Sequence, residues 1–207
     1  STPIKSSAAS DVYKRQTYVS YRMIPNGFIF DSNKGPMIFP KMHNPSLLYT
    51  IGFLNTKVSN LITSILNPTV STQIGDIIKV PLAIKDSVVH KIEDMANNNI
   101  SISQQDWDSH ETSWDFEENP LLSYINQGIA KGEIGKSYKI ESLYNLYTTD
   151  WEERFIQLHA NEEELNRQFI EIYGLQDELT PDVPLDEVTI LQLSLIHISE
   201  PTRRTPI

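Results

Sequence analysis

The segment from Ser103 to Leu122, SQQDWDSHETSWDFEENPLL, constrains the fold of this chain more than any other stretch. Trp107 and Trp114 lie seven residues apart, which is about two turns of an α-helix. Acidic side chains are interleaved with these tryptophans and with Phe116. The spacing therefore predicts a helix with both indoles on one buried face and the carboxylates in water. Pro120 predicts that the helix ends or changes direction there.

Both ends of the chain look foreign to the rest. Residues 6–16 read SSAASDVYKRQ and residues 193–203 read LSLIHISEPTR, and both resemble in-frame translations of the two transposase adapters used to prepare DNA for sequencing. We therefore expect residues 1–16 and 193–207 to be adapter-derived and non-native, with no part in the native fold. The remaining residues, 17–192, are expected to be an internal piece of a longer reading frame, without a secretory peptide or a membrane span.

Charge divides the region 17–192 into two unequal halves. Residues 17–105 carry seven Lys/Arg and five Asp/Glu, whereas residues 106–192 carry five Lys/Arg and 20 Asp/Glu. A polyanion such as DNA would be attracted by the first half and repelled by the second. The chain contains no cysteine, which excludes disulfides and thiolate chemistry and is typical of a cytoplasmic protein.

Periodicity predicts a mixed α+β fold that is mostly helical. In the first half, Phe28–Phe30 and Met37–Phe39 are predicted to form a hairpin of two short strands, and Val80–Leu82 a further short strand. Residues 46–66 carry apolar side chains at three- and four-residue spacing, which predicts one amphipathic helix. A second amphipathic helix is predicted from Asp86 to Met95.

The second half is predicted to be a helical arm that is acidic outside and aromatic inside. Asp150 and Asn161 are each followed three residues later by a glutamate, so both fit capping boxes at the start of a helix. Trp151, Phe155 and Leu158 would form an apolar face. Gly174 fits the end of the last helix, and the prolines in the stretch that follows predict an extended segment.

Three stretches of the chain are similar to one protein family. GFLNTKVSNLITSILNPTVSTQIGDIIKVPL, residues 52–82, resembles the closing part of a target-recognition domain in DNA methyltransferases. SQQDWDSHETSWDFEENPLL is similar to a DWDS-x-E-T-S-W-D-F segment of large bacterial adenine-specific DNA methyltransferases, namely the methylase of BREX-type phage-resistance systems and its type IIG restriction-modification relatives. HANEEELNRQFIEIYGLQDELTPDVPLDEVTI, residues 159–190, resembles a second stretch of that family in the same order.

The resemblance implies a fragment of such an enzyme. Residues 17–84 would be the end of the target-recognition lobe, and residues 85–192 a spacer helix followed by an acidic helical domain. The family transfers a methyl group from S-adenosylmethionine to the exocyclic amine of adenine in double-stranded DNA. Its Asn/Asp-Pro-Pro-Tyr/Phe catalytic loop and Gly-rich cofactor loop have no counterpart in this sequence. No catalytic or cofactor-binding residue is therefore carried over, and the fragment alone is expected to be inactive and to bind no S-adenosylmethionine.

A lobe that reads DNA needs cations for the phosphates and amides for the base edges. The candidate DNA-binding residues are Arg22, Lys34, Lys41 and Lys57 for phosphate contacts and Asn44, Asn55 and Gln73 for base contacts. We expect Lys41→Ala and Lys57→Ala in the full enzyme to weaken DNA binding and to flatten its salt dependence.

The acidic segment also raises the question of a metal site. Carboxylates with one histidine, as in Asp106, Asp108, His110 and Glu111, would suit a hard divalent ion. Their spacing favours a solvated acidic face over buried tryptophans, so no metal site is predicted. Base stacking by Trp107 or Trp114 is disfavoured because the flanking carboxylates would repel phosphates.

Two other functions stay open at this point. The parent could be a fused restriction-modification endonuclease, whose nuclease motif would lie upstream of this fragment. Alternatively, the acidic second half could be a non-catalytic protein-interaction module that binds other subunits of a phage-defence complex.

Overall fold

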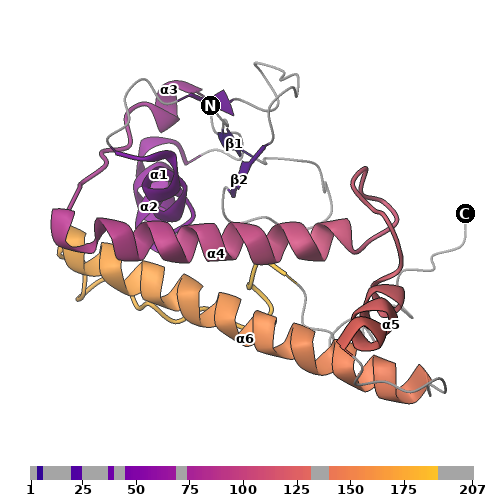
Figure 1. The fold of residues 1–207 in the computed structure, drawn as a ribbon. Coiled ribbons are helices and arrows are strands. Elements are labelled where there is room, and N and C mark those ends of the chain that lie inside the picture. Colours follow the sequence, from indigo (N-terminus) through magenta and orange to yellow (C-terminus); the bar gives the residue numbers. More distant parts are fainter. Residues whose placement is uncertain are drawn as a thin grey trace, which may run out of the picture. The chain divides into compact units, whose positions relative to one another are not determined.

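The computed structural model of the chain describes residues 4–6, 20–24, 37–39, 45–68, 74–131 and 140–190, with the backbone alone for residues 4–6 and 126–131. The strands are β1 (Ile4–Ser6), β2 (Tyr21–Met23) and β3 (Met37–Ile38). The helices are α1 (Leu47–Leu54), α2 (Lys57–Leu66), α3 (Ile74–Ile77), the 3₁₀ helix η1 (Asp86–Val88), α4 (Val89–Asp108), α5 (Pro120–Lys131) and α6 (Ile140–Tyr173). The predicted fold class, mixed but mostly helical, is confirmed (Figure 1). None of the described helices is long and apolar enough to cross a bilayer.

The three strands form a small antiparallel sheet in the order β2-β1-β3. Ile4 of β1 lies opposite Met23 of β2 on one side and Ile38 of β3 on the other. The strand predicted at Met37–Phe39 is thus confirmed for its first two residues, while its predicted hairpin partner, Phe28–Phe30, lies outside the described residues. Since β1 belongs to the stretch expected to be adapter-derived, we assign the sheet no function.

The chain divides into two compact units, each with its own core. Unit 1 comprises residues 1–100 and 161–182, and unit 2 comprises residues 101–160 and 183–207. The helices α4 and α6 each contribute residues to both units. Because the polypeptide enters each unit twice, neither unit is one continuous stretch of sequence.

The core of unit 1 forms where aromatic residues of α1 and α6 meet. Phe169 is fully buried, with its ring centroid 5.5 Å from that of Tyr49 and 5.2 Å from that of Phe53. Tyr173 stacks on Phe53 with 5.5 Å between ring centroids. Aliphatic side chains complete the core: Ile51, Leu54, Val58, Ile92, Leu165 and Ile170. A Cβ at Gly52 would lie 3.3 Å from the side chain of Ile92, so glycine allows the close approach of α1 and α4.

The single helix predicted for residues 46–66 is wrong, because the chain bends between α1 and α2. The Asn55 side chain bonds to the backbone of Tyr21, accepting from Tyr21 N at 2.8 Å and donating to Tyr21 O at 3.0 Å. Thr56 then caps α2 by accepting a hydrogen bond from Ser59 N. The hydrogen bonds of Asn55 and Thr56 interrupt what would otherwise be one continuous helix. The spacing of the apolar residues on either side gives no sign of these bonds.

The strand predicted at Val80–Leu82 is also wrong, because this stretch follows α3 as irregular backbone bonded to two tyrosine hydroxyls. Tyr173 Oη accepts from Ala83 N at 2.9 Å and donates to Pro81 O at 2.5 Å. Tyr49 Oη donates to Ala83 O at 2.9 Å. Side chains thus satisfy the backbone groups that a neighbouring strand would otherwise bond.

The helix predicted from Asp86 to Met95 is confirmed and extends further, since η1 leads into α4, which reaches Asp108. The prediction that both tryptophans share one buried helix face is wrong. Successive turns follow α4, and the side chains of Trp107 and Trp114 are 54% and 94% exposed. The spacing of seven residues therefore does not translate into a common helix face.

The core of unit 2 is formed by the end of α4, the first half of α6 and residues that follow α6. Its buried side chains are Ile102, Trp151, Phe155, Leu158, Val188 and Ile190. The predicted apolar face of Trp151, Phe155 and Leu158 is confirmed. Arg154 lies over the Trp151 ring at 4.8 Å from its centroid, which adds a cation–π contact at the edge of this core.

The helix starts predicted at Asp150 and Asn161 are wrong, because α6 is continuous from Ile140 to Tyr173. The Asp150 carboxylate accepts a hydrogen bond from Tyr124 and pairs with Arg154 at 2.8 Å. Asn161 Nδ2 donates at 2.8 Å to the side-chain oxygens of both Asn98 and Asn99. Tertiary partners therefore use the polar groups that the sequence pattern assigns to helix caps.

The predicted end of the last helix at Gly174 is confirmed. Gly174 has a φ of 67°, and Leu175 N donates to Ile170 O at 3.0 Å, as in a Schellman motif. Turns follow at residues 176–178, and residues 180–184, predicted to be extended, lie outside helices, turns and strands. This reversal returns the chain along α6.

Candidate nucleic-acid interface

Of the seven predicted DNA-binding residues, the structure describes Arg22, Asn55 and Lys57. The other four lie outside the described residues: Lys34, Lys41, Asn44 and Gln73. Arg22 lies on β2 and its side chain is exposed. Since Asn55 bonds to the backbone of Tyr21, Arg22 lies beside the bend between α1 and α2, at which Lys57 begins α2. The fold thus brings the three described candidates to the junction between the end of α1 and the start of α2.

Asn55 and Lys57 are bonded within unit 1. The Asn55 amide uses its oxygen and its nitrogen on Tyr21, and the nitrogen also donates to Ile51 O at 3.2 Å. Lys57 Nζ donates to the backbone oxygen of Asp182 at 2.5 Å. Among the three described candidates, Arg22 is therefore the one that the fold presents most directly for a phosphate contact.

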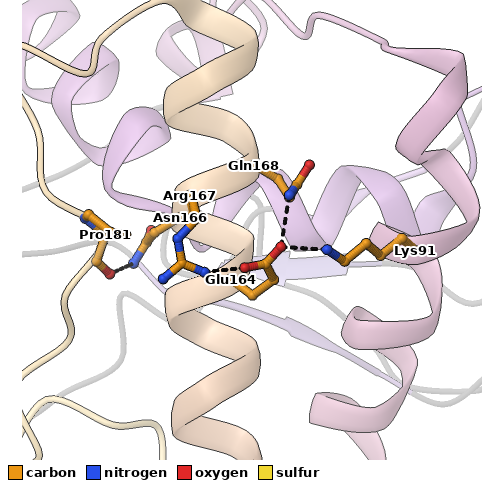
Figure 2. Close-up of polar contacts among 6 residues, drawn as sticks. All are labelled: Lys91, Glu164, Asn166, Arg167, Gln168 and Pro181. Carbon is orange, nitrogen blue, oxygen red and sulfur yellow. Dashed lines mark hydrogen bonds and ion pairs between the residues drawn. The ribbon is translucent and has the colours of Figure 1, made fainter.

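Asn166 joins three parts of unit 1. Its side chain is 5% exposed, and Oδ1 accepts from Lys57 N at 2.9 Å. Nδ2 donates to Pro181 O at 3.2 Å (Figure 2). One amide thus ties the first turn of α2 to α6 and to the extended segment after α6.

Glu164 is the centre of a polar cluster between α4 and α6, shown in Figure 2. Its Oε1 accepts from Lys91 Nζ at 2.5 Å and from Gln168 Nε2 at 2.8 Å, while Oε2 pairs with the Arg167 guanidinium. Burial alone would raise the pKa of Glu164, but the hydrogen bonds from Lys91, Gln168 and Arg167 outweigh it and hold the pKa below its ordinary value. The carboxylate therefore stays charged and satisfied inside unit 1.

The roles of Glu164 and Asn166 are not evident from the sequence. The spacing of Asn161 and Glu164 predicts a helix cap, which is a local role for Glu164. The available signal was the position of Asn166 directly after Leu165, inside an apolar stripe, where a polar side chain needs a partner. That partner lies more than a hundred residues earlier in the chain, at Lys57.

The fold changes the charge pattern that the sequence suggests. Residues 17–100 and 161–182 form the part of unit 1 outside the adapter-like end, and together they carry eight Lys/Arg and 12 Asp/Glu. Lys85 pairs with Glu171 at 2.8 Å, and Lys91 pairs with Glu164. Acidic residues of α6 therefore neutralise cations of the first half, which reduces the attraction for DNA expected from that half alone.

The residues considered as a metal cluster are bonded locally. His110 Nδ1 lies 2.6 Å from Asp106 O, and the Asp108 carboxylate accepts from Ser113 Oγ at 2.7 Å. Burial raises the pKa of Asp106, and nearby His110 opposes this shift. Across the part of the chain that the structure describes, no three His, Cys, Asp or Glu side chains form a group that could hold a metal ion.

The described residues do not fit S-adenosylmethionine. Their glycines lie within α1, α3 and α5 or directly after α6, and none forms a loop between a strand and a helix. Asn67-Pro68 and Asn119-Pro120 each lack a second proline. A shallow hollow of about 350 Å³ on unit 1 is lined partly by Asp86 and Glu93 and offers no glycine-rich cradle. No methyl-transfer step is therefore assigned to these residues.

Two curated bacterial proteins are similar to the chain. It is 38% identical over 176 residues to the adenine-specific methyltransferase PglX of Lacticaseibacillus casei (strain Zhang). This match covers 85% of this chain and 14% of that protein. It is also 32% identical over 170 residues to the adenine-specific methyltransferase BrxX of Escherichia coli O9:H4 (strain HS). This match covers 82% of this chain and 13% of that protein. The chain thus spans about one seventh of the length of these relatives. No family model matches it.

Proposed function

We infer a function from one premise, that this chain is homologous to a segment of the adenine-specific methyltransferases PglX and BrxX. We propose that it is part of a larger enzyme that transfers a methyl group from S-adenosylmethionine to the exocyclic amine of adenine in double-stranded DNA. The observation that carries the proposal is the 38% identity over 176 residues. From the motif resemblance we further propose that this enzyme belongs to a BREX-type phage-resistance system or to its type IIG relatives and acts in the cytoplasm.

Within the enzyme, the role proposed for this segment is target recognition and scaffolding. Methylating a base inside a duplex requires that base to be flipped out, so other parts of the protein must hold and read the flanking DNA. Residues 17–84 would contribute the end of the recognition lobe, and residues 85–192 the spacer helix and acidic helical domain. The hydrogen bond from Lys57 N to Asn166 supports a scaffolding role for α6, because it holds the first turn of α2 against α6.

A segment exchange tests the proposal. Residues 17–192 would replace the matching segment of full-length L. casei PglX, and methylated adenines in the host genome would be mapped by long-read sequencing. The control is PglX carrying its own segment recoded with synonymous codons. We expect the hybrid to methylate adenine.

The recognised DNA site separates the two roles. A changed site would assign target recognition to this segment, and an unchanged site would assign it scaffolding alone. A hybrid that is folded and soluble but methylates nothing would contradict the proposal. Cleavage of the host DNA by the parent enzyme would favour the fused endonuclease alternative.

The phosphate contacts are tested by the salt dependence of DNA binding in the full enzyme. Each lost phosphate contact should reduce the slope of log K against log salt by about 0.9. Arg22→Ala, Lys41→Ala and Lys57→Ala are expected to flatten the slope. The matched control is Arg154→Ala, because Arg154 pairs with Asp150 in unit 2 and should leave the slope unchanged. An unchanged slope in the first three variants would remove those residues from the interface.

A further inference from the structure

The turn that follows α4 presents an indole to solvent. The side chain of Trp114 is 94% exposed, and that of Trp107, at the end of α4, is 54% exposed. Trp151 of the same unit is 7% exposed, as is usual for a side chain of this size. Two neighbouring tryptophans that a folded unit leaves in water are suited to a binding surface, because aromatic anchors that become buried on association carry much of the energy of protein interfaces.

Hydrogen bonds hold this turn in a defined conformation. Ser113 is buried, and its Oγ donates to the Asp108 carboxylate at 2.7 Å and accepts from Asp115 N at 3.1 Å. Ser113 N donates to His110 O at 2.9 Å. The backbone on both sides of Trp114 is therefore held, so the indole projects from a defined position on the turn.

The surroundings of the turn decide what chemistry that partner has. From Ile92 to Ala130 the chain contains eight Asp/Glu and no Lys or Arg. Six of these acids lie at or beside the turn: Asp106, Asp108, Glu111, Asp115, Glu117 and Glu118. DNA phosphates would be repelled, whereas a protein surface with Lys or Arg around an apolar recess would be complementary in charge and would take up the indole.

We propose that the Trp114 turn, taken together with the end of α4 as residues 106–118, docks onto a basic and apolar surface in the remaining polypeptide of the parent enzyme. This inference rests on the proposed function, since it assumes that larger enzyme. The chain spans 14% of the length of PglX, so an enzyme of that size has ample polypeptide outside this segment. A surface tethered to the same chain is present at high effective concentration, which favours it over a separate protein.

Photo-cross-linking in the full-length parent enzyme tests the docking. Trp114→p-benzoylphenylalanine would be irradiated, and the cross-linked peptides identified by mass spectrometry. We expect a peptide rich in Lys or Arg from the same polypeptide, outside residues 17–192. The matched control position is Leu146, which is 53% exposed on α6 of the same unit and lies outside the turn. A comparable yield at Leu146 would overturn the proposal.

The charge of the turn provides a second test. Asp115→Lys combined with Glu117→Lys should lower the cross-linking yield severalfold, as should raising the ionic strength to about 1 M. In the 207-residue chain, Trp114→Ala should leave the unfolding midpoint unchanged, because an indole that is 94% exposed contributes little to folding. A large shift of that midpoint would mean that Trp114 packs within its own unit, and would also overturn the proposal.

The remaining outcomes separate this proposal from the proposed function. Adenine methylation by the same enzyme preparation would be measured in parallel. An active methyltransferase that gives no cross-link, a cross-link to DNA, or a cross-link to a second copy would refute docking alone. A parent without adenine methylation would refute the proposed function, whatever the cross-linking result.

Discussion

Asn166→Ala is expected to destabilise unit 1 by about 2–4 kcal/mol. The substitution leaves Lys57 N without its acceptor at 2.9 Å, and an unsatisfied donor in partly buried surroundings costs about 1–3 kcal/mol. It also removes the bond to Pro181 O at 3.2 Å, whose net contribution is about 1 kcal/mol because that carbonyl can regain water. For a chain of this length, 1 kcal/mol lowers the melting temperature by about 2–4 °C.

The assay is guanidinium denaturation of the full chain followed by far-UV circular dichroism. Asn166→Asp keeps an oxygen that accepts from Lys57 N, but it buries a carboxylate whose other oxygen faces Pro181 O, so its loss of stability at neutral pH should be at least as large as that of the alanine variant. The matched control is Asn98→Ala. Asn161 keeps Asn99 as an acceptor in that variant, so the free energy of unfolding should change by less than about 0.5 kcal/mol.

Limited proteolysis gives an independent readout of the same tie. Loss of the bond to Pro181 should speed cleavage of the extended segment after α6 in Asn166→Ala and not in Asn98→Ala. If the alanine variant at position 166 were as stable as the control, this amide would not hold α2, α6 and the extended segment together.

Two further substitutions test the polar cluster and the end of α6. Glu164→Gln should reduce the sensitivity of unit 1 to acid. The pKa of Glu164 in the folded state lies below its ordinary value of 4.5. The charged carboxylate therefore stabilises the fold fully above pH 4.5, and this stabilisation is lost as the pH falls through the pKa of the folded state. Free energies of unfolding measured from about pH 7 to pH 3 should converge for the wild type and this variant at the acid end, and parallel curves would contradict the assignment. Gly174→Ala should cost about 1–2 kcal/mol because φ is 67°, with Gly174→Asn costing less; equal stability of all three proteins in denaturant would show that the turn relaxes without strain.

Local patterns in the sequence predict the parts of this fold that depend on neighbouring residues. The apolar spacing of Trp151, Phe155 and Leu158 identifies the buried face of α6, and Gly174 identifies its end, because both signals are contained within a few turns of helix. The bend at Asn55 is different. It depends on hydrogen bonds to Tyr21, which is 34 residues away in the chain, and no local period records such a partner.

The same distinction separates the predicted and the observed roles of polar residues. Asn161 and Asp150 fit helix caps in sequence, yet both lie inside α6 because side chains of other helices satisfy them. The sequence suggests that Lys57 is a free cation, yet its Nζ donates to the backbone oxygen of Asp182. The exposure of Trp107 and Trp114 could not be predicted either, since it depends on where α4 ends and not on their spacing.

The return of residues 161–182 to unit 1 determines when this unit can form during synthesis. A ribosome that has reached residue 100 has made α1, α2 and the first part of α4, but the core still lacks Leu165, Phe169 and Ile170. All of residues 101–160 must be translated before those side chains arrive, so the nascent chain exposes the apolar faces of α1 and α2 for that time and is a natural client for chaperones. If the parent enzyme is divided into separately expressed pieces, residues 161–182 must therefore stay in the same piece as the rest of unit 1.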